Sequence, residues 1–179
     1  RTLPLLGKTP HGGWDGRLSA EGNNLHTLLE VISDEGVTGL GSVFTSKKLV
    51  DGAIEVLRPL LIGSSAIDPA STSETLHQHT FWQGRGGAIT HAISGIDIAL
   101  WDILGKVTRQ PISRLLGGRQ REAIKPYGSL LMREPEQMGD ELHAGLARGF
   151  KAYKIGWGRF GRRNAATDEA IVVAARKAV

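Results

Sequence analysis

The stretch that decides the fold is residues 88–106, AITHAISGIDIALWDILGK, which PISRLLGG follows at residues 111–118. Its large apolar residues recur at steps of three and four, the spacing of one helical face: Ile89, Ile93, Ile96, Leu100 and Ile103. Beside them runs a stripe of small residues: Ala88, Ala92, Gly95 and Ala99. A stripe without bulk lets another backbone approach closely, so we expect a largely buried helix with neighbours on two sides. We expect Gly105 to end it, because Pro111 cannot continue it.

Two aspartates lie on this helix. Asp97 and Asp102 fit an ordinary polar face, and Asp102 stands four residues before Lys106, the spacing of a helical ion pair. The string SGIDIALWDILGK, followed by QPISRLLGG, resembles the hallmark helix of the enolase superfamily, in its mandelate racemase / muconate lactonizing enzyme branch. In that branch the helix is a scaffold that joins a capping domain to a β/α barrel. The resemblance therefore gives neither aspartate a catalytic role.

The composition limits the class of protein. A chain of 179 residues with 40% hydrophobic content can bury a real core, as one domain or one and a half. The absence of cysteine excludes disulfides and thiolate metal sites and is compatible with a cytoplasmic protein. No apolar run approaches the roughly 20 residues of a membrane span, and no charged-then-apolar leader opens the chain. We therefore expect a soluble protein that does not enter a membrane.

The net charge of +4 and the pI near 9.6 raise the possibility of a nucleic-acid partner. However, Lys and Arg are scattered singly or in pairs, aromatic residues make up only 6%, and no zinc-finger or aromatic-basic pattern occurs. A modestly basic solvated surface explains the charge better, so we expect no nucleic-acid partner. A positive balance also suits a small anionic substrate.

Both ends of the chain look cut, since it starts with Arg1 and stops at Val179 inside a helical pattern. We therefore expect a segment of a longer protein. Residues 1–24 are glycine-rich and predict an irregular loop, in which His11 and Trp14 are the side chains suited to ligand contact. In relatives of mandelate racemase a loop near this place closes over the barrel mouth and helps to select the substrate. The resemblance thus implies that His11 and Trp14 bind substrate.

Residues 25–45 predict an antiparallel hairpin, in which LHTLLEVIS and VTGLGSVFT flank the turn DEG. Gly39 and Gly41 in the second strand indicate a bulge or a close backbone approach. Residues 49–61 predict a helix whose apolar face is Leu49, Ala53, Val56 and Leu60.

A second helix should follow Asp68 and run to about Trp82. His77 and His79 in it are two residues apart, which places them on different faces and makes them a poor metal pair. The segment QGRGG at residues 83–87 lacks the Lys-Ser/Thr of a phosphate loop and should simply introduce the next helix. His91 on that helix is assigned no role.

After LLGG the pattern alternates between strand and helix. Strands are predicted over 123–131 and 150–155, and helices over 134–148, which Gly149 stops, and 164–179. Such alternation builds parallel βαβ units, in a doubly wound sheet or a TIM barrel. Two units cannot close a barrel of about eight strands. With the resemblance, the expected fold is an α+β capping domain over residues 1–118 and the first two βα units of a TIM-type barrel over 119–179.

Barrel enzymes place their functional groups at the C-terminal ends of strands. At the first such end, alternation puts Tyr127, Ser129 and Leu131 on one face, so Ser129 could offer a hydroxyl to a ligand. At the second, GFKAYKIGWGRFG, Lys151 and Lys154 point to opposite faces, and Lys154 lies nearer the functional end. A lysine buried at a strand end is costly unless it meets an anion, so Lys154 is the candidate catalytic residue and Ser129 a candidate substrate-binding residue.

Relatives of mandelate racemase commonly carry Lys-x-Lys at this strand, the second lysine being a base for the carbon next to a substrate carboxylate. Aligned through Gly149 and Phe150, Lys154 matches the first lysine and Gly156 stands at the second. A racemase needs bases on both faces of the carbon, whereas dehydration needs one base and an acid for the departing hydroxyl. We therefore favour an acid-sugar dehydratase in which Lys154 holds the substrate carboxylate or tunes a neighbour.

The resemblance also implies Mg²⁺, which steadies the enediolate and is held by carboxylates on the third to fifth barrel strands, with a histidine base further on. None of these positions falls within the 179 residues, so no metal ligand is expected in this segment. The expected protein is a cytoplasmic homo-oligomer acting on a small carboxylate. The alternatives are a racemase, epimerase or cycloisomerase of the same superfamily, or a non-catalytic fragment.

Overall fold

The computed structural model describes residues 1–4 and 26–179, which form two compact units, Arg1–Arg119 and Gln120–Val179. The first unit contains an antiparallel sheet in the order β1 (Thr2–Pro4), β2 (Thr27–Ile32) and β3 (Thr38–Val43). The hairpin predicted over 25–45 is confirmed. The irregular loop predicted over 1–24 is wrong for residues 2–4, because these residues pair with β2 as a short edge strand.

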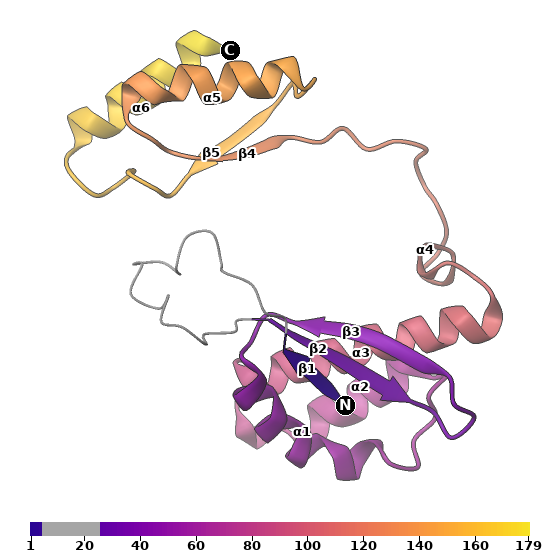
Figure 1. The fold of residues 1–179 in the computed structure, drawn as a ribbon. Coiled ribbons are helices and arrows are strands. Elements are labelled where there is room, and N and C mark those ends of the chain that lie inside the picture. Colours follow the sequence, from indigo (N-terminus) through magenta and orange to yellow (C-terminus); the bar gives the residue numbers. More distant parts are fainter. Residues whose placement is uncertain (5–25) are drawn as a thin grey trace. The chain divides into compact units, whose positions relative to one another are not determined.

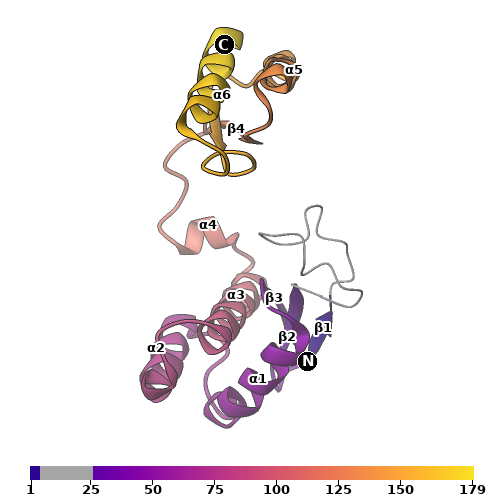
Figure 2. The ribbon, with the colours of Figure 1, turned by 90° about the vertical axis from the view of Figure 1, so that its left-hand side faces the viewer.

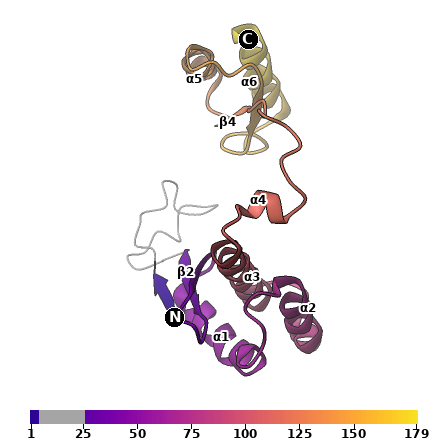
Figure 3. The same ribbon diagram turned by 90° about the vertical axis from the view of Figure 1, so that its right-hand side faces the viewer.

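The unit has three long helices, α1 (Lys47–Leu61), α2 (Pro69–His79) and α3 (Ala88–Thr108). Helices α1 and α3 pack on the sheet, and α2 packs on the other two helices. Figures 1 and 2 show the sheet on one side of α3, and Figure 3 shows α2 packed beside α3. The second helix ends at His79, earlier than predicted, and a short 3₁₀ helix occupies Phe81–Gln83. A single turn, α4 (Ile112–Leu115), follows α3.

The predicted inner face of α1 is wrong for two of its four residues, since Ala53 is buried and Leu60 packs partly buried against the core. Leu49 and Val56 are exposed, whereas Val50, Ala53 and Leu57 are buried. Val50 and Leu57, each one position after a predicted residue, replace Leu49 and Val56 on the inner face, and Ala53 is common to both sets. Apolar residues line more than one side of this helix, so periodicity alone could not choose between the two faces.

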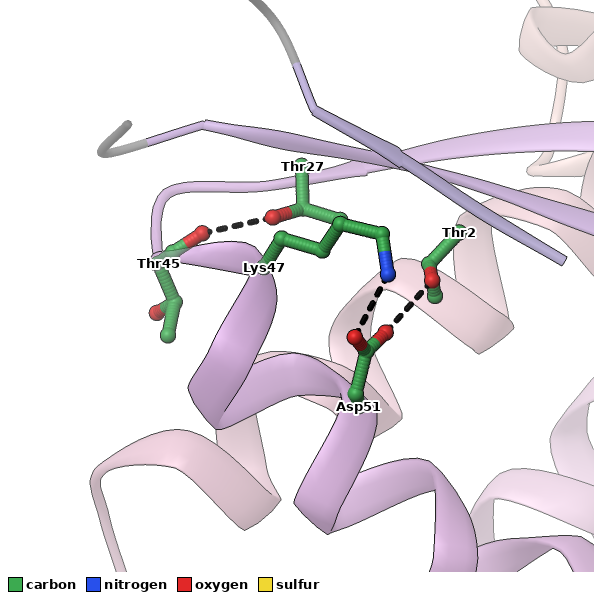
Figure 4. Close-up of polar contacts among 5 residues, drawn as sticks. All are labelled: Thr2, Thr27, Thr45, Lys47 and Asp51. Atoms are coloured by element: carbon green, nitrogen blue, oxygen red, sulfur yellow. Dashed lines mark hydrogen bonds and ion pairs between the residues drawn. The ribbon is translucent and has the colours of Figure 1, made fainter. Parts of the chain in front are cut away.

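Polar contacts tie β1 and β2 to the start of α1 and to Thr45 just before it (Figure 4). The Asp51 carboxylate accepts hydrogen bonds from the Lys47 ammonium and from the Thr2 hydroxyl of β1. The buried Thr27 hydroxyl of β2 donates to the carbonyl of Thr45, 2.8 Å away. These contacts fix β1 and the beginning of β2 against the rest of the unit.

Helix α3 forms the centre of the core, as predicted. Of its large apolar stripe, Ile93, Ile96, Leu100 and Ile103 are buried against the sheet and helices and Ile89 is partly buried; of its small stripe, Ala92, Gly95 and Ala99 are buried. The helix runs three residues past Gly105 and ends where Arg109 adopts a left-handed conformation, with φ of 54°. Gly105 therefore does not end it; a Cβ there would meet the carbonyl oxygen of Gln110 at 3.0 Å.

Backbone contact between α3 and β3 explains the small stripe. A Cβ on Gly41 would overlap the carbonyl oxygen of Gly95, and a Cβ on Gly39 would overlap that of Ala99. The close approach predicted from Gly39 and Gly41 is thus confirmed. By length and composition α3 could also cross a membrane, contrary to the sequence expectation, but its burial by the sheet and by α1 and α2 identifies it as a core helix.

A polar cluster fastens the same two elements. Asp102 of α3 accepts hydrogen bonds from the Leu40 backbone N–H of β3, at 2.9 Å, and from the Lys106 ammonium, at 2.8 Å. Lys106 also donates to the carbonyl of Thr38, at 2.7 Å. The predicted ion pair between Asp102 and Lys106 is confirmed, and it also serves the edge of β3.

The second unit has two strands, β4 (Gly128–Leu131) and β5 (Tyr153–Gly156), and two helices, α5 (Pro135–Ala147) and α6 (Ala165–Ala178). The strands pair in parallel across α5, as the alternation predicted. Both strands are shorter than predicted: residues 123–127 and 150–152 lie outside the ladder. Figure 1 shows α5 and α6 on the same side of the strand pair.

The close approach of α3 and β3 gives a first prediction. Gly41→Ala should lower the free energy of unfolding by about 3 kcal/mol, because backbone must move to admit the methyl group. Gly52→Ala in α1 is the matched control: nothing lies within 4 Å of its Cβ, so it should raise stability by about 0.5–1 kcal/mol. Urea unfolding of both variants measures the difference. Equal midpoints would contradict the proposed contact.

The polar cluster gives a second prediction. Burial raises the pKa of Asp102, but hydrogen bonds from Lys106 and the Leu40 N–H outweigh it, and the net pKa lies below its ordinary value of 3.8. The pKa of Asp51 is lowered in the same sense by Lys47 and Thr2. A carboxylate with a lowered pKa stabilises the fold above the unfolded value and loses that contribution as the pH falls below it.

Unfolding free energy should therefore decline as the pH drops from about 5 toward 3. Asp102→Asn should be less stable than the parent at pH 7, and its free energy of unfolding should fall less steeply as the pH drops. Adding Asp51→Asn should make this fall shallower still. Thermal unfolding at several pH values tests this. A decline in Asp102→Asn as steep as in the parent would contradict the role of Asp102.

Candidate functional site

The candidate site lies on the β4–β5 pair of the second unit. In this parallel ladder Ser129 is the register partner of Lys154, and Leu131 that of Gly156. The alternate residues Leu130, Tyr153 and Ile155 pack against the core formed with α5 and α6, so Ser129 and Lys154 share the opposite face. Both side chains are exposed, so the burial expected for Lys154 is wrong: α5 and α6 both pack on the opposite face of the strand pair. The structure thus brings together, on one face, the two polar residues singled out at the strand ends.

Tyr153 determines which face β5 presents. Its ring fits between two glycines: a Cβ on Gly145 of α5 would lie 2.6 Å from the Tyr153 hydroxyl, and a Cβ on Gly128 of β4 would lie 2.9 Å from the ring. The hydroxyl donates to the carbonyl of Leu142, 3.2 Å away. Because this ring is held on the helix side, Lys154 must point to the other side.

The turn after β5 is anchored to the end of β4. The Met132 N–H donates to the Gly156 carbonyl, at 3.1 Å, and the Met132 carbonyl accepts from the Arg159 N–H, at 2.9 Å. Between them Trp157 and Gly158 both have positive φ, of 54° and 63°. A Cβ on Gly158 would overlap the Met132 carbonyl, so only glycine fits there.

Ion pairs hold the rest of this loop. Arg159 contacts the Glu134 carboxylate at 3.0 Å and Arg163 contacts it at 3.4 Å. The Gly161 N–H donates to Asp168 in the first turn of α6, at 3.0 Å. A cavity of about 350 Å³ opens beside these residues; Met132, Arg133, Gly158 and Arg162 are among those that line it. The C-terminal edge of the strand pair is therefore structured and carries positive charge.

The ammonium of Lys154 lies 4.4 Å from the ring centroid of Trp157. That distance is within the range of a cation–π contact. The sequence pattern by itself assigned Trp157 no role. The signal that could have found it is a tryptophan set between two glycines directly after a strand, GWG at residues 156–158.

The other predicted site residues divide into two groups. His11 and Trp14 lie outside the described residues. Lys151, the alternative to Lys154, is exposed and precedes β5. The functional roles of Lys154, Ser129, His11 and Trp14 stay predictions.

The described residues were also compared with the demands of a metal. Within residues 1–4 and 26–179, no three His, Asp or Glu side chains come close enough to hold an ion. His77 and His79 are exposed on α2. His91 hydrogen-bonds the Thr45 hydroxyl in the first unit. This part of the chain therefore does not fit a magnesium site.

The family follows from comparison with known proteins. A family profile described as the N-terminal domain of mandelate racemase / muconate lactonizing enzyme matches residues 18–117, more than half of the chain. The chain belongs to this family. Its resemblance to the enolase superfamily is confirmed, and with it the capping-domain fold of the first unit.

Two of the relatives carry names that refer to acid sugars. A D-galactonate dehydratase family member of Paenibacillus sp. (strain JDR-2) is 34% identical over 144 residues, which are 78% of this chain and 35% of the relative. The crystal structure of the 3,6-anhydro-D-galactonate cycloisomerase of Zobellia galactanivorans is 31% identical, with a TM-score of 0.74 over 86% of this chain and 42% of that one.

A third relative was solved with metal. The mandelate racemase/muconate lactonizing protein of Paracoccus denitrificans PD1222, in complex with magnesium, is 26% identical, with a TM-score of 0.73 over 85% of this chain and 43% of that one. The chain thus spans about two fifths of the length of these relatives.

Packing around Tyr153 gives a third prediction. Gly145→Ala should destabilise the second unit by about 1–3 kcal/mol, because the methyl group meets the Tyr153 hydroxyl. Gly139→Ala, on the same helix with open space around its Cβ, should raise stability by about 0.5–1 kcal/mol. Hydrogen exchange at β4 and β5 measures the local effect. Unchanged protection in Gly145→Ala would mean that the ring does not lie in this slot.

Proposed function

We propose that this chain is the N-terminal part of an acid-sugar dehydratase that abstracts a proton next to a substrate carboxylate. The observation that carries the proposal is the pairing of Ser129 with Lys154 in the β4–β5 register, on the face away from α5 and α6. In a β/α barrel this face is the interior, and the strand ends open on the active site. A lysine ammonium and a hydroxyl side by side suit a carboxylate with hydroxyl neighbours.

The choice of dehydration rests on Gly156. Its position is on the Lys154 face of β5, and it offers no side chain that could take or give a proton. Racemisation needs a proton removed from one face of the carbon and delivered to the other, whereas elimination of water needs a base on one face only. The Paenibacillus relative, named a dehydratase family member, agrees with this choice.

A cycloisomerase of the same superfamily is the second candidate, and the Zobellia relative favours it. Cycloisomerisation shares proton transfer next to a carboxylate with dehydration, so Lys154 and Ser129 would serve it equally well. The two reactions differ in their products, and product analysis separates them.

The proposal includes the surroundings that the family implies. Mg²⁺ would be held by residues other than those described, and its chemistry when bound is stabilisation of the enediolate; the Paracoccus relative was solved with magnesium. We further propose residues 1–118 as the capping domain and 119–179 as the opening of the barrel. His11 and Trp14 would contact the substrate from the capping domain. The proposed setting is a cytoplasmic homo-oligomer.

The decisive test uses the complete gene product, assayed against a panel of hexonates and hexarates with detection of keto-acid products. Lys154→Met should lower kcat/KM on the active sugar acid by about 100-fold, through loss of a charge-assisted hydrogen bond to the carboxylate. Lys151→Met is the matched control, with the same change of charge three residues away, and should retain activity. Kinetics unaffected by Lys154→Met would reject the assignment of Lys154.

A further inference from the structure

Trp157 combines two unusual properties. It and Arg109 are the two non-glycine residues with positive φ within residues 1–4 and 26–179. Such a conformation is disfavoured for a bulky side chain, so it persists only where the surroundings enforce it. The same residue places its ring 4.4 Å from the Lys154 ammonium. A strained residue in contact with the candidate functional lysine calls for a functional explanation.

The turn enforces this conformation. Gly158 must pass against the Met132 carbonyl, and the hydrogen bonds from Met132 to Gly156 and from Arg159 to Met132 fix the chain on both sides of Trp157. The Phe160 N–H also donates to the Trp157 carbonyl, at 3.3 Å. The direction of the Trp157 side chain is therefore set by the backbone of the turn and not by burial, since the residue is 50% exposed.

Gly156 leaves room for this arrangement. A Cβ on Gly156 would meet nothing within 4 Å, so the face of β5 just beyond Lys154 is open. Gly156 itself has no side chain that could contact the lysine. The ring of Trp157, one residue further on, is the group that contacts the ammonium.

We propose that Trp157 is a positioning residue, whose ring holds the Lys154 ammonium at the C-terminal end of β5 so that it binds the substrate carboxylate. The substrate named in this inference rests on the proposed function, whereas the contact between Trp157 and Lys154 is independent of it. The ring attracts the cation through its π-face without accepting a directional hydrogen bond. The ammonium N–H groups that point away from the ring stay available to a carboxylate, beside the Ser129 hydroxyl of the neighbouring strand.

This role makes Lys154 a binding group and not a proton acceptor. Loss of the ring should therefore weaken substrate binding, by letting the flexible lysine stem leave its place, and should have little effect on the chemical step. If Trp157 had a purely structural role, loss of the ring would instead lower the stability of the protein and would not change KM selectively.

The experiment removes or replaces the Trp157 ring without adding strain to the backbone. Trp157→Gly removes the ring and suits the positive φ, so stability should be retained or raised. Trp157→Phe keeps a weaker π-face at the same strained position. Trp82→Ala, which removes a 92% exposed tryptophan from the first unit, is the control. All variants are made in the complete protein.

The direct readout is the NMR signal of the Lys154 ε-methylene in ¹³C-lysine-labelled protein, assigned by its absence in Lys154→Met. In the parent the ring current should shift this signal upfield. The shift should vanish in Trp157→Gly, persist in part in Trp157→Phe, and be unchanged in Trp82→Ala. An ε-methylene signal that is the same in the parent and Trp157→Gly would overturn the contact, whatever the activity.

The kinetic readout tests the consequence. Trp157→Gly should raise KM for the active sugar acid about 3- to 30-fold, with kcat changed less than about 2-fold, and Trp157→Phe should restore part of the loss. A fall in kcat with KM unchanged would overturn the positioning role. Failure of the proposed function is seen separately, as full activity of Lys154→Met, while the NMR result still decides whether Trp157 holds the lysine.

Discussion

The first unit depends on the contact between two backbones, those of α3 and β3. Gly39 and Gly41 meet the carbonyl groups of Ala99 and Gly95, so the helix axis lies closer to the sheet than any side chain would allow. The large stripe of α3 can then fill the space between the sheet and α1 and α2. Asp102 and Lys106 fasten the same interface at its polar edge. The remaining contacts of the capping domain are arranged around this one approach.

The sequence predicted features that depend on local spacing. The α3 stripes, the close approach of Gly39, and the parallel strand pair follow from periodicity and from the absence of a side chain. The inner face of α1 was predicted only in part, because adjacent apolar residues such as Leu49 and Val50 point to different sides of the helix and only packing against the neighbouring elements decides which side is buried. Strand β1 was not predicted, because three residues are too few to show the alternation of a strand, and they form one only by pairing with β2.

The candidate site was predictable in part for the same reasons. Alternation placed Ser129 and Lys154 at strand ends, but the side on which each would lie was settled by the packing of the Tyr153 ring between α5 and β4. The GWG pattern marks Trp157 but does not give its conformation, because the positive φ opposes the residue's own preference and depends on the passage of Gly158 against Met132, which is distant in the sequence. Tertiary contacts override local preference there.

The slot that receives Tyr153 has a consequence for how this segment can change during evolution. Because side chains alternate along a strand, gain of one codon between Tyr153 and Lys154 would leave the ring in its slot and send the ammonium into the helix-packed core. Gain of two codons would leave Lys154 on the face opposite to Tyr153, as it is now. Insertions in this part of the strand should therefore be tolerated only when they add an even number of residues, because the position of the Tyr153 ring fixes which face each later side chain occupies.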